Sequence, residues 1–273
     1  MKKQIFTILF AVSVCILPAI VKADLIFSAP PREKPAVGEQ LYGPIAESLS
    51  VMMGEKVVYK HPRDWLTYSM KMRRGDYDLV FDGPQFSSWR MQHIQHVPLV
   101  RLQGHLGFLI ITKNDSGVNT IQDLIAKKIC GLASPNLATI SMLREFKNPV
   151  RQPIFVETKG GMKGIYNKLK SGKCVAAVMR DGFYNNKLSD EVKAQYKIIW
   201  KSKRMPNQTI TASKRIPAEL RDQIVASLTT ERGSSSAAAL FKRFSKKSKQ
   251  FIAANDAEYN DLNNLLEGVV WGW

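Results

Sequence analysis

Short apolar runs alternate with longer segments of helical periodicity along the first part of the chain. The apolar runs at 25–29, 56–60 and 77–81 predict three strands. Between them, residues 40–53 and 65–72 repeat apolar side chains at steps of three and four, which indicates two amphipathic helices. Because tight connections join these elements, the pattern predicts β-α-β-α-β in a doubly wound α/β sheet.

The third predicted strand leads into the stretch around which the chain is organised. A basic pair precedes Gly75, and this order is typical of a helix C-terminus. Asp82 closes the strand, and Gly83-Pro84 predicts a turn that opens a new helix. The carboxyl ends of parallel strands bind ligands in open α/β sheets, and helix N-termini favour anions. Two interpretations stay open here, an ordinary connection and a ligand-binding loop.

A second series of strands and helices follows residue 97. Two extended segments come first and further strands follow, at 99–102, 106–112, 128–133, 153–157, 174–179 and 198–200. The intervening helices are predicted at 120–128, 141–146 and 163–170. A strand at 209–212 leads back, and the remaining helices are predicted at 218–228, 237–251 and 255–266.

Two tandem βαβαβ units predict two lobes. We expect lobe I to be discontinuous, with residues 24–104 plus 206–273, and lobe II to span 105–205. Extended segments near 101–106 and 205–210 are the expected hinge strands, because no helix separates the lobes there.

The first 23 residues have the composition of an export signal. A basic start at Lys2 and Lys3 is followed by an apolar stretch and by Val21-Lys22-Ala23, a cleavage site with small residues at its first and last positions. Val14 directly precedes Cys15, where lipid attachment needs a small residue, so we expect a cleaved protein rather than a lipoprotein. No later apolar run is long enough to span a bilayer.

The formal net charge of +17 falls by three when the leader is removed. A basic exported protein can bind nucleic acid, anionic membranes or small anions. Part of the charge lies at 242–249, which we interpret as a solvated helix face. No motif with aromatic platforms indicates nucleic-acid binding.

Two cysteines remain after export, Cys130 and Cys174. An oxidising compartment permits a disulfide between them. Each lies at or beside a strand-like apolar run, so two buried free thiols are the alternative. His93 and His96 are spaced three apart, but nothing near them completes a metal site, and we expect neither metal nor cofactor. No nucleophile elbow, phosphate loop or paired carboxylates indicate catalysis.

The order of these elements resembles the type II periplasmic substrate-binding proteins of ABC importers, and within them the phosphate/phosphite/phosphonate-binding (PhnD-like) subfamily. The resemblance covers nearly all of the mature chain and is carried by the segments 28–35, 66–75, 78–80, 83–84, 121–124, 164–172 and 216–221. It implies a periplasmic protein that closes two lobes on a ligand and delivers it to a membrane permease, without chemistry of its own. We expect a monomer with no nucleic-acid partner.

Several positions depart from the subfamily pattern. Ser87 stands where a tyrosine is usual, Leu137 and Ala138 replace hydroxyl side chains, Met162 replaces a histidine and Val175 an aspartate. These replacements remove hydrogen-bond donors, and a buried anion without donors is costly. The resemblance therefore implies the fold but not the specificity for phosphonate.

The candidate ligand contacts are loop residues at strand ends together with two aromatic side chains. Arg32 is the strongest candidate, because a guanidinium binds an anionic group with two donors. The full set is Pro31, Arg32, Tyr42, Asp82, Gly83, Pro84, Gln85, Phe86, Ser134, Asn136, Thr139, Arg180, Asp181 and Tyr184. Besides capture of a small anionic or zwitterionic ligand, two alternatives remain: a sensor module partnered with a membrane receptor, and an exported enzyme on the same scaffold.

Overall fold

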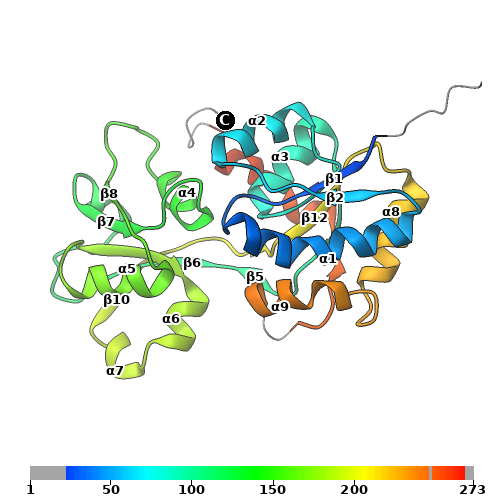
Figure 1. Cartoon of the computed structure of the whole chain (residues 1–273). Helices are drawn as coiled ribbons and strands as arrows, with labels where there is room; N and C mark the ends of the chain where they lie inside the picture. Colours follow the sequence, from blue (N-terminus) through cyan, green and yellow to red (C-terminus); the bar gives the residue numbers. More distant parts are fainter. Residues whose placement is uncertain (1–22, 246–247, 268–273) are drawn as a thin grey trace, which may run out of the picture.

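The computed structural model describes residues 23–245 and 248–267, so the predicted leader lies outside the described residues except for Ala23. The described part of the chain forms a six-stranded sheet, a five-stranded sheet and a two-stranded sheet. Figure 1 shows two lobes joined by extended segments. We call the six-stranded sheet and its helices lobe I, and the five-stranded sheet and its helices lobe II. None of the helices formed by the described residues has the length and apolar character needed to cross a bilayer.

Lobe I combines parallel strands from the first part of the chain with antiparallel strands from later parts. Its sheet order is β13-β4-β12-β3-β1-β2, and the strands are β1 (Leu25–Ser28), β2 (Val57–Tyr59), β3 (Leu79–Asp82), β4 (Val97–Arg101), β12 (Thr209–Ala212) and β13 (Ile252–Ala253). Its helices are α1 (Pro35–Met53), α2 (Trp65–Arg74), α3 (Pro84–Ile94), α8 (Ala218–Leu228), η2 (Ser235–Ala237) and α9 (Ala238–Phe244). The predicted parallel core β2-β1-β3 is confirmed.

Lobe II has the sheet order β10-β6-β9-β7-β8. Its strands are β6 (Phe108–Lys113), β7 (Lys128–Gly131), β8 (Ile154–Glu157), β9 (Ala176–Arg180) and β10 (Tyr196–Lys201). Its helices are η1 (Ile121–Leu124), α4 (Leu137–Leu143), α5 (Gly161–Lys170), α6 (Asp181–Lys187) and α7 (Asp190–Lys193). The helix predicted at 120–128 is only the 3-10 turn η1. The helix predicted at 141–146 begins earlier, because the Asn136 side chain caps it.

Between the lobes, β5 (His105–Leu106) pairs with β11 (Met205–Pro206) at the positions predicted for hinge strands. Arg101 ends β4 just before this crossing, and its guanidinium binds both carboxylate oxygens of Glu258 at 2.9 Å. Glu258 belongs to η3 (Asp256–Tyr259), which is followed by η4 (Leu262–Leu265). The long helices predicted for the tail are therefore wrong beyond Phe244: residues 252–253 pair with β4, and short 3-10 turns follow.

Residues at the helix ends determine the course of the chain from α2 through β3 to α3. The Asp64 side chain accepts the backbone N–H of Thr67 at 2.7 Å and caps α2. Gly75 ends α2 with φ 74°, which confirms the left-handed cap predicted from the sequence. Pro84 opens α3, as predicted, where its missing N–H costs no hydrogen bond.

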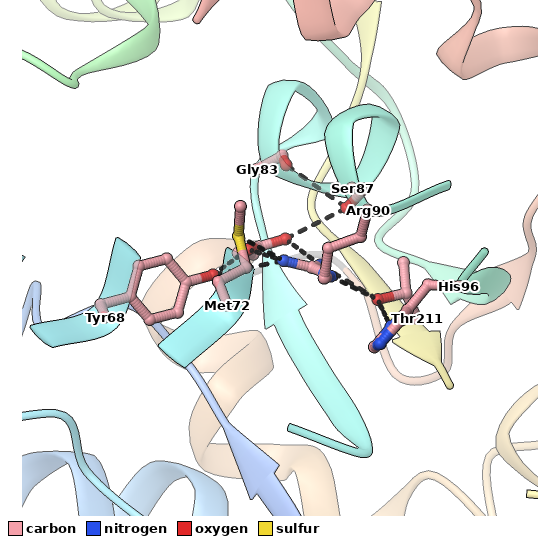
Figure 2. Close-up of polar contacts among 8 residues, drawn as sticks. Tyr68, Met72, Gly83, Ser87, Arg90, His96 and Thr211 are labelled. Atoms are coloured by element: carbon pink, nitrogen blue, oxygen red, sulfur yellow. Dashed lines mark hydrogen bonds and ion pairs between the residues drawn. The ribbon is translucent and has the colours of Figure 1, made fainter. Parts of the chain in front are cut away.

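A buried ion pair connects β3, α3 and β12 (Figure 2). Both side chains of the pair are fully buried, and Arg90 binds the two Asp82 oxygens at 2.7 and 2.8 Å. Arg90 also donates to the Thr211 hydroxyl, while Ser87 and Tyr68 donate to Asp82. Burial alone would lower the pKa of Arg90, but Asp82 and Tyr68 raise it overall above its ordinary value. The Arg90 guanidinium therefore stays protonated inside the lobe.

His96 extends this network beyond the end of α3, so it does not lie on a helix with His93. It is only 4% exposed, and its Nδ1 atom lies 3.2 Å from the Thr211 hydroxyl. Burial, followed by the neighbouring Arg90 charge, lowers the pKa of His96 to about 2. The Nε2 atom of His93 instead lies 2.6 Å from the Oε1 atom of Glu267. Among the described residues, no three His, Cys, Asp or Glu side chains gather as a metal site.

Cys130 and Cys174 form a disulfide in the core of lobe II, with their Cα atoms 5.8 Å apart. The bond joins β7 to the segment that enters β9. Of the two alternatives, the structure contains the disulfide and not the two free thiols.

Replacing Cys174 with serine should lower the free energy of unfolding by about 2–4 kcal/mol, because the closed loop restricts the unfolded chain. Thermal unfolding with and without reductant measures the effect. Reductant should lower the Tm of the wild type by several degrees and leave the Tm of the variant unchanged. Equal Tm values for oxidised wild type and variant would contradict the prediction.

Replacing Arg90 with methionine should destabilise the protein by about 3–5 kcal/mol, because the Asp82 carboxylate then remains buried without a counterion. Denaturant unfolding provides the measurement. Arg63→Met is the matched control, since the Arg63 side chain is 83% exposed in its pair with Asp64 and should cost less than about 1 kcal/mol. Similar losses in the two variants would show that the buried pair contributes no more than an exposed one.

The buried neutral His96 should make the protein less stable in mild acid. Its pKa is lower in the folded chain than its ordinary value of 6.5, so the unfolded chain binds the extra proton as pH falls below that value. The expected loss is about 1.4 kcal/mol between about pH 7.5 and pH 5.5. Denaturant unfolding of wild type and His96→Gln across this range is the test. Parallel pH profiles for the two proteins would refute the assignment to His96.

Candidate functional site

A cavity of about 260 Å³ lies between the two lobes. Residues that follow or flank strand ends form much of its wall. From lobe I and the hinge they are Arg32, Trp65, Gly83, Gln85, Phe86, Leu106 and Gln208. From lobe II they are Phe108, Leu132, Ala133, Pro135, Asn136, Leu137, Met162 and Arg180. The cavity therefore has one wall from each half of a two-lobed molecule.

Two arginines from different lobes line this cavity. Arg32 follows β1, and its Nη1 atom is buried without a hydrogen-bond partner. Arg180 ends β9, where burial lowers the pKa of its guanidinium and the neighbouring Asp181 opposes that shift. Since a guanidinium remains protonated at any ordinary pH, both residues present positive charge to the cavity. The pair is suited to an anion.

An ion pair joins the loop that contains Arg32 to helix α9 in the C-terminal part of lobe I. Arg243 in α9 binds the Glu33 carboxylate through Nε and Nη2, both at 2.9 Å. The Arg243 guanidinium also lies 5.0 Å from the centre of the Phe244 ring. Because Glu33 is the next residue after Arg32, this contact restricts the position of the cavity arginine.

Three amide side chains add polar groups. Gln85, in the first turn of α3, is 2% exposed, and its Oε1 has no partner; the Oε1 of Gln208 is also buried without one. The absence of a side chain at Gly83 leaves space for the Gln85 amide, because a Cβ at position 83 would lie 2.6 Å from the Gln85 Oε1 atom. The Oδ1 of Asn136 already accepts the N–H of Ala138 at 3.1 Å.

The remaining wall is apolar and aromatic. Trp65 and Phe86 stack with ring centroids 6.1 Å apart and an interplanar angle of 25°. Leu137 and Met162 line the opposite side, which places two of the departures from the subfamily pattern in the cavity. Ala138 instead lies in the core.

The structure brings six of the predicted contact residues to the cavity: Arg32, Gly83, Gln85, Phe86, Asn136 and Arg180. The others do not line it. They are Pro31, Tyr42, Asp82, Pro84, Ser134, Thr139, Asp181 and Tyr184.

Internal contacts explain most of these exclusions. Asp82 is fully buried in its pair with Arg90, so its carboxylate does not reach the cavity lining. Tyr42 packs in the core of lobe I, where burial raises the pKa of its phenol to about 12, and Tyr184 packs in a core cluster of lobe II. The Thr139 hydroxyl donates to the Leu132 carbonyl, and Asp181 accepts the N–H of Gly182. Pro84 is buried in α3, whereas Ser134 is exposed and Pro31 partly exposed.

Sequence reasoning missed the residues whose position depends on the meeting of the lobes. Trp65, Leu106, Phe108 and Gln208 carry no local signal, because each follows a pattern that a core or hinge residue would also have. Leu137 and Met162 were singled out only as departures from a family pattern.

Comparison with known proteins identifies the family. The family model described as "ABC transporter, phosphonate, periplasmic substrate-binding protein" matches residues 27–259. No curated protein sequence matches the chain.

Solved structures share the fold at low sequence identity. XAC2383 from Xanthomonas citri bound to ATP matches with a TM-score of 0.69 and 13% identity, covering 91% of this chain and 97% of that one. PhnD1 from Prochlorococcus marinus in complex with methylphosphonate matches with a TM-score of 0.61 and 14% identity, covering 89% and 96%. PA3383 from Pseudomonas aeruginosa, a binding component of an ABC phosphonate transporter, matches with a TM-score of 0.56 and 15% identity, covering 88% and 84%.

The family model spans most of the chain, and these structures repeat its two-lobed type II fold. The chain therefore belongs to the phosphonate-binding periplasmic substrate-binding proteins of ABC transporters.

Proposed function

We propose that this protein captures a small organic anion of the phosphonate class in the interlobe cavity and delivers it to an ABC permease in the inner membrane. The observation that carries the proposal is the pair of cavity arginines, one from each lobe, with Arg32 Nη1 buried and unpartnered. An anion that binds both guanidinium groups supplies the missing hydrogen-bond acceptor and contacts both lobes at once.

The proposal includes the division of the chain and its processing. Lobe I comprises residues 24–104 with the segment from 206 onward, and lobe II comprises 105–205. The support is that β12 and β13 join the sheet of β1–β4, whereas β6–β10 form the other sheet. Cleavage after Ala23 releases a monomeric periplasmic protein that performs no catalysis and binds no nucleic acid.

The first experiment is a thermal-shift panel on the purified mature chain, beginning at Asp24. It contains phosphate, phosphite, sulfate, alkylphosphonates, arylphosphonates, aminoalkylphosphonates, carboxylates, amines and ATP. A ligand at a hundred times its Kd adds about 2.7 kcal/mol to the stability. We expect the largest shift from a phosphonate. A larger shift from an amine without an acid group would overturn the proposal.

Arg32→Ala and Arg180→Ala should each raise the Kd of the best phosphonate about tenfold or more, because each change removes a charge-assisted hydrogen bond of about 1.5–3 kcal/mol. Isothermal titration calorimetry measures the change. Arg232→Ala is the matched control, since Arg232 is exposed and lies outside the cavity lining, and its Kd should match the wild type. Unchanged affinity in both cavity variants would remove the two arginines from the site.

A further inference from the structure

The unpartnered polar atoms of the cavity lie on one of its two walls. Among the described residues, three buried polar atoms that lack a hydrogen-bond partner belong to cavity-lining side chains: Arg32 Nη1, Gln85 Oε1 and Gln208 Oε1. All three come from the lobe I wall. A buried polar group without a partner is costly, so this wall is built to be completed by a polar ligand group.

The register of the sheet explains why these groups gather. Thr209 in β12 pairs with Asp82 in β3, so the residue before Thr209 lies beside the turn that follows Asp82. This turn contains Gly83 and leads to Gln85, and β1, which leads to Arg32, pairs with β3 on its other side. One cationic donor and two amide oxygens therefore share one end of the lobe I sheet.

The lobe II wall offers few polar groups. In its turn after β7, Leu132 O accepts the Thr139 hydroxyl, Ala133 O accepts the Asn136 N–H at 3.0 Å, and Pro135 has no N–H. The lining there is otherwise apolar. It consists of the residues Phe108, Leu132, Ala133, Pro135, Leu137 and Met162.

Arg180 and Asn136 are the polar exceptions in this wall. The Asn136 Oδ1 is used in capping α4. The backbone N–H of Arg180 donates to the Met162 sulfur at 3.4 Å, so the two residues lie side by side at this wall. An inorganic oxyanion held by the guanidinium groups leaves the apolar surface of lobe II in contact with water.

We infer that the ligand is amphiphilic: a phosphonate whose acid group binds the lobe I wall and whose sizeable apolar substituent, an aryl group or a branched alkyl chain, packs against lobe II. This inference rests on the proposed function and narrows its ligand class. The anionic oxygens accept from Arg32 and, across the cavity, from Arg180, and an O–H or N–H beside them donates to the two glutamine oxygens. The substituent lies between Leu137, Met162 and Phe108.

The test compares ligands with the same acid group and different substituents. One pair is methylphosphonate and phenylphosphonate, and the other is aminomethylphosphonate and amino(phenyl)methylphosphonate. Burial of the ring should lower the Kd about tenfold to a hundredfold within each pair. Calorimetry gives the Kd, and the tryptophan fluorescence, to which Trp65 in the cavity wall contributes, reports binding independently.

Variants locate the substituent. Met162→Gln should reduce the ratio of the two Kd values within each pair about tenfold, because the change removes apolar surface from the lobe II wall. Met70→Gln is the matched control, since Met70 is 51% exposed and lies outside the cavity lining; it should keep the full preference. Leu137→Ser provides a second, independent change in the same wall, and circular dichroism and Tm show that each variant is folded.

Each outcome decides between the claims. A phenyl preference that Met162→Gln or Leu137→Ser removes supports the inference. Equal or tighter binding of the small partners overturns it while the proposed function stands. A phenyl preference that survives both variants also overturns the assignment to lobe II. Failure of every phosphonate to bind the folded wild type overturns the proposed function itself.

Discussion

The buried pair of Asp82 and Arg90 is the contact on which the arrangement of lobe I and its cavity wall depends. It joins the end of β3 to α3, and through Thr211 it reaches β12, which returns from lobe II. A buried charge is tolerable only when it is paired and hydrogen-bonded, and here donors surround the carboxylate. The turn that begins at Gly83 is thereby held next to β12, and the glutamine amides on either side face the same cavity.

Local sequence signals predicted the elements near this pair well. Gly75 and Pro84 mark helix ends for backbone reasons that need no tertiary partner, and α8 has the predicted bounds of 218–228. The helices predicted for the C-terminal tail were wrong for the opposite reason, because the structure there depends on a tertiary partner. Residues 252–253 become a strand because β4 offers an edge for pairing, and no property of the tail alone reveals that edge.

The candidate site was predictable where chain order alone determines position. Arg32 follows β1 and Arg180 ends β9, and the carboxyl ends of parallel strands form the binding edge of an α/β sheet. Asp82 satisfies the same rule but does not line the cavity, because it is paired with Arg90, which lies about two turns into the next helix. Sequence order does not distinguish an acid that faces a ligand from one that holds a helix. Gln208 and Trp65 were missed since their place in the wall depends on how distant segments meet.

In the proposed function, the placement of the cations couples anion binding to the approach of the two lobes. Arg32 and Arg180 carry like charges on opposite walls of one cavity, so their repulsion opposes approach of the lobes. An anion between the two guanidinium groups attracts both of them, so the net interaction across the cavity becomes favourable. The anion contacts both walls only when the walls are near each other. Such a ligand binds the closed arrangement more tightly than the open one, and that difference in affinity is the condition for a ligand to shift a conformational equilibrium. The apolar wall of lobe II adds to the difference, because closure removes its surface from water.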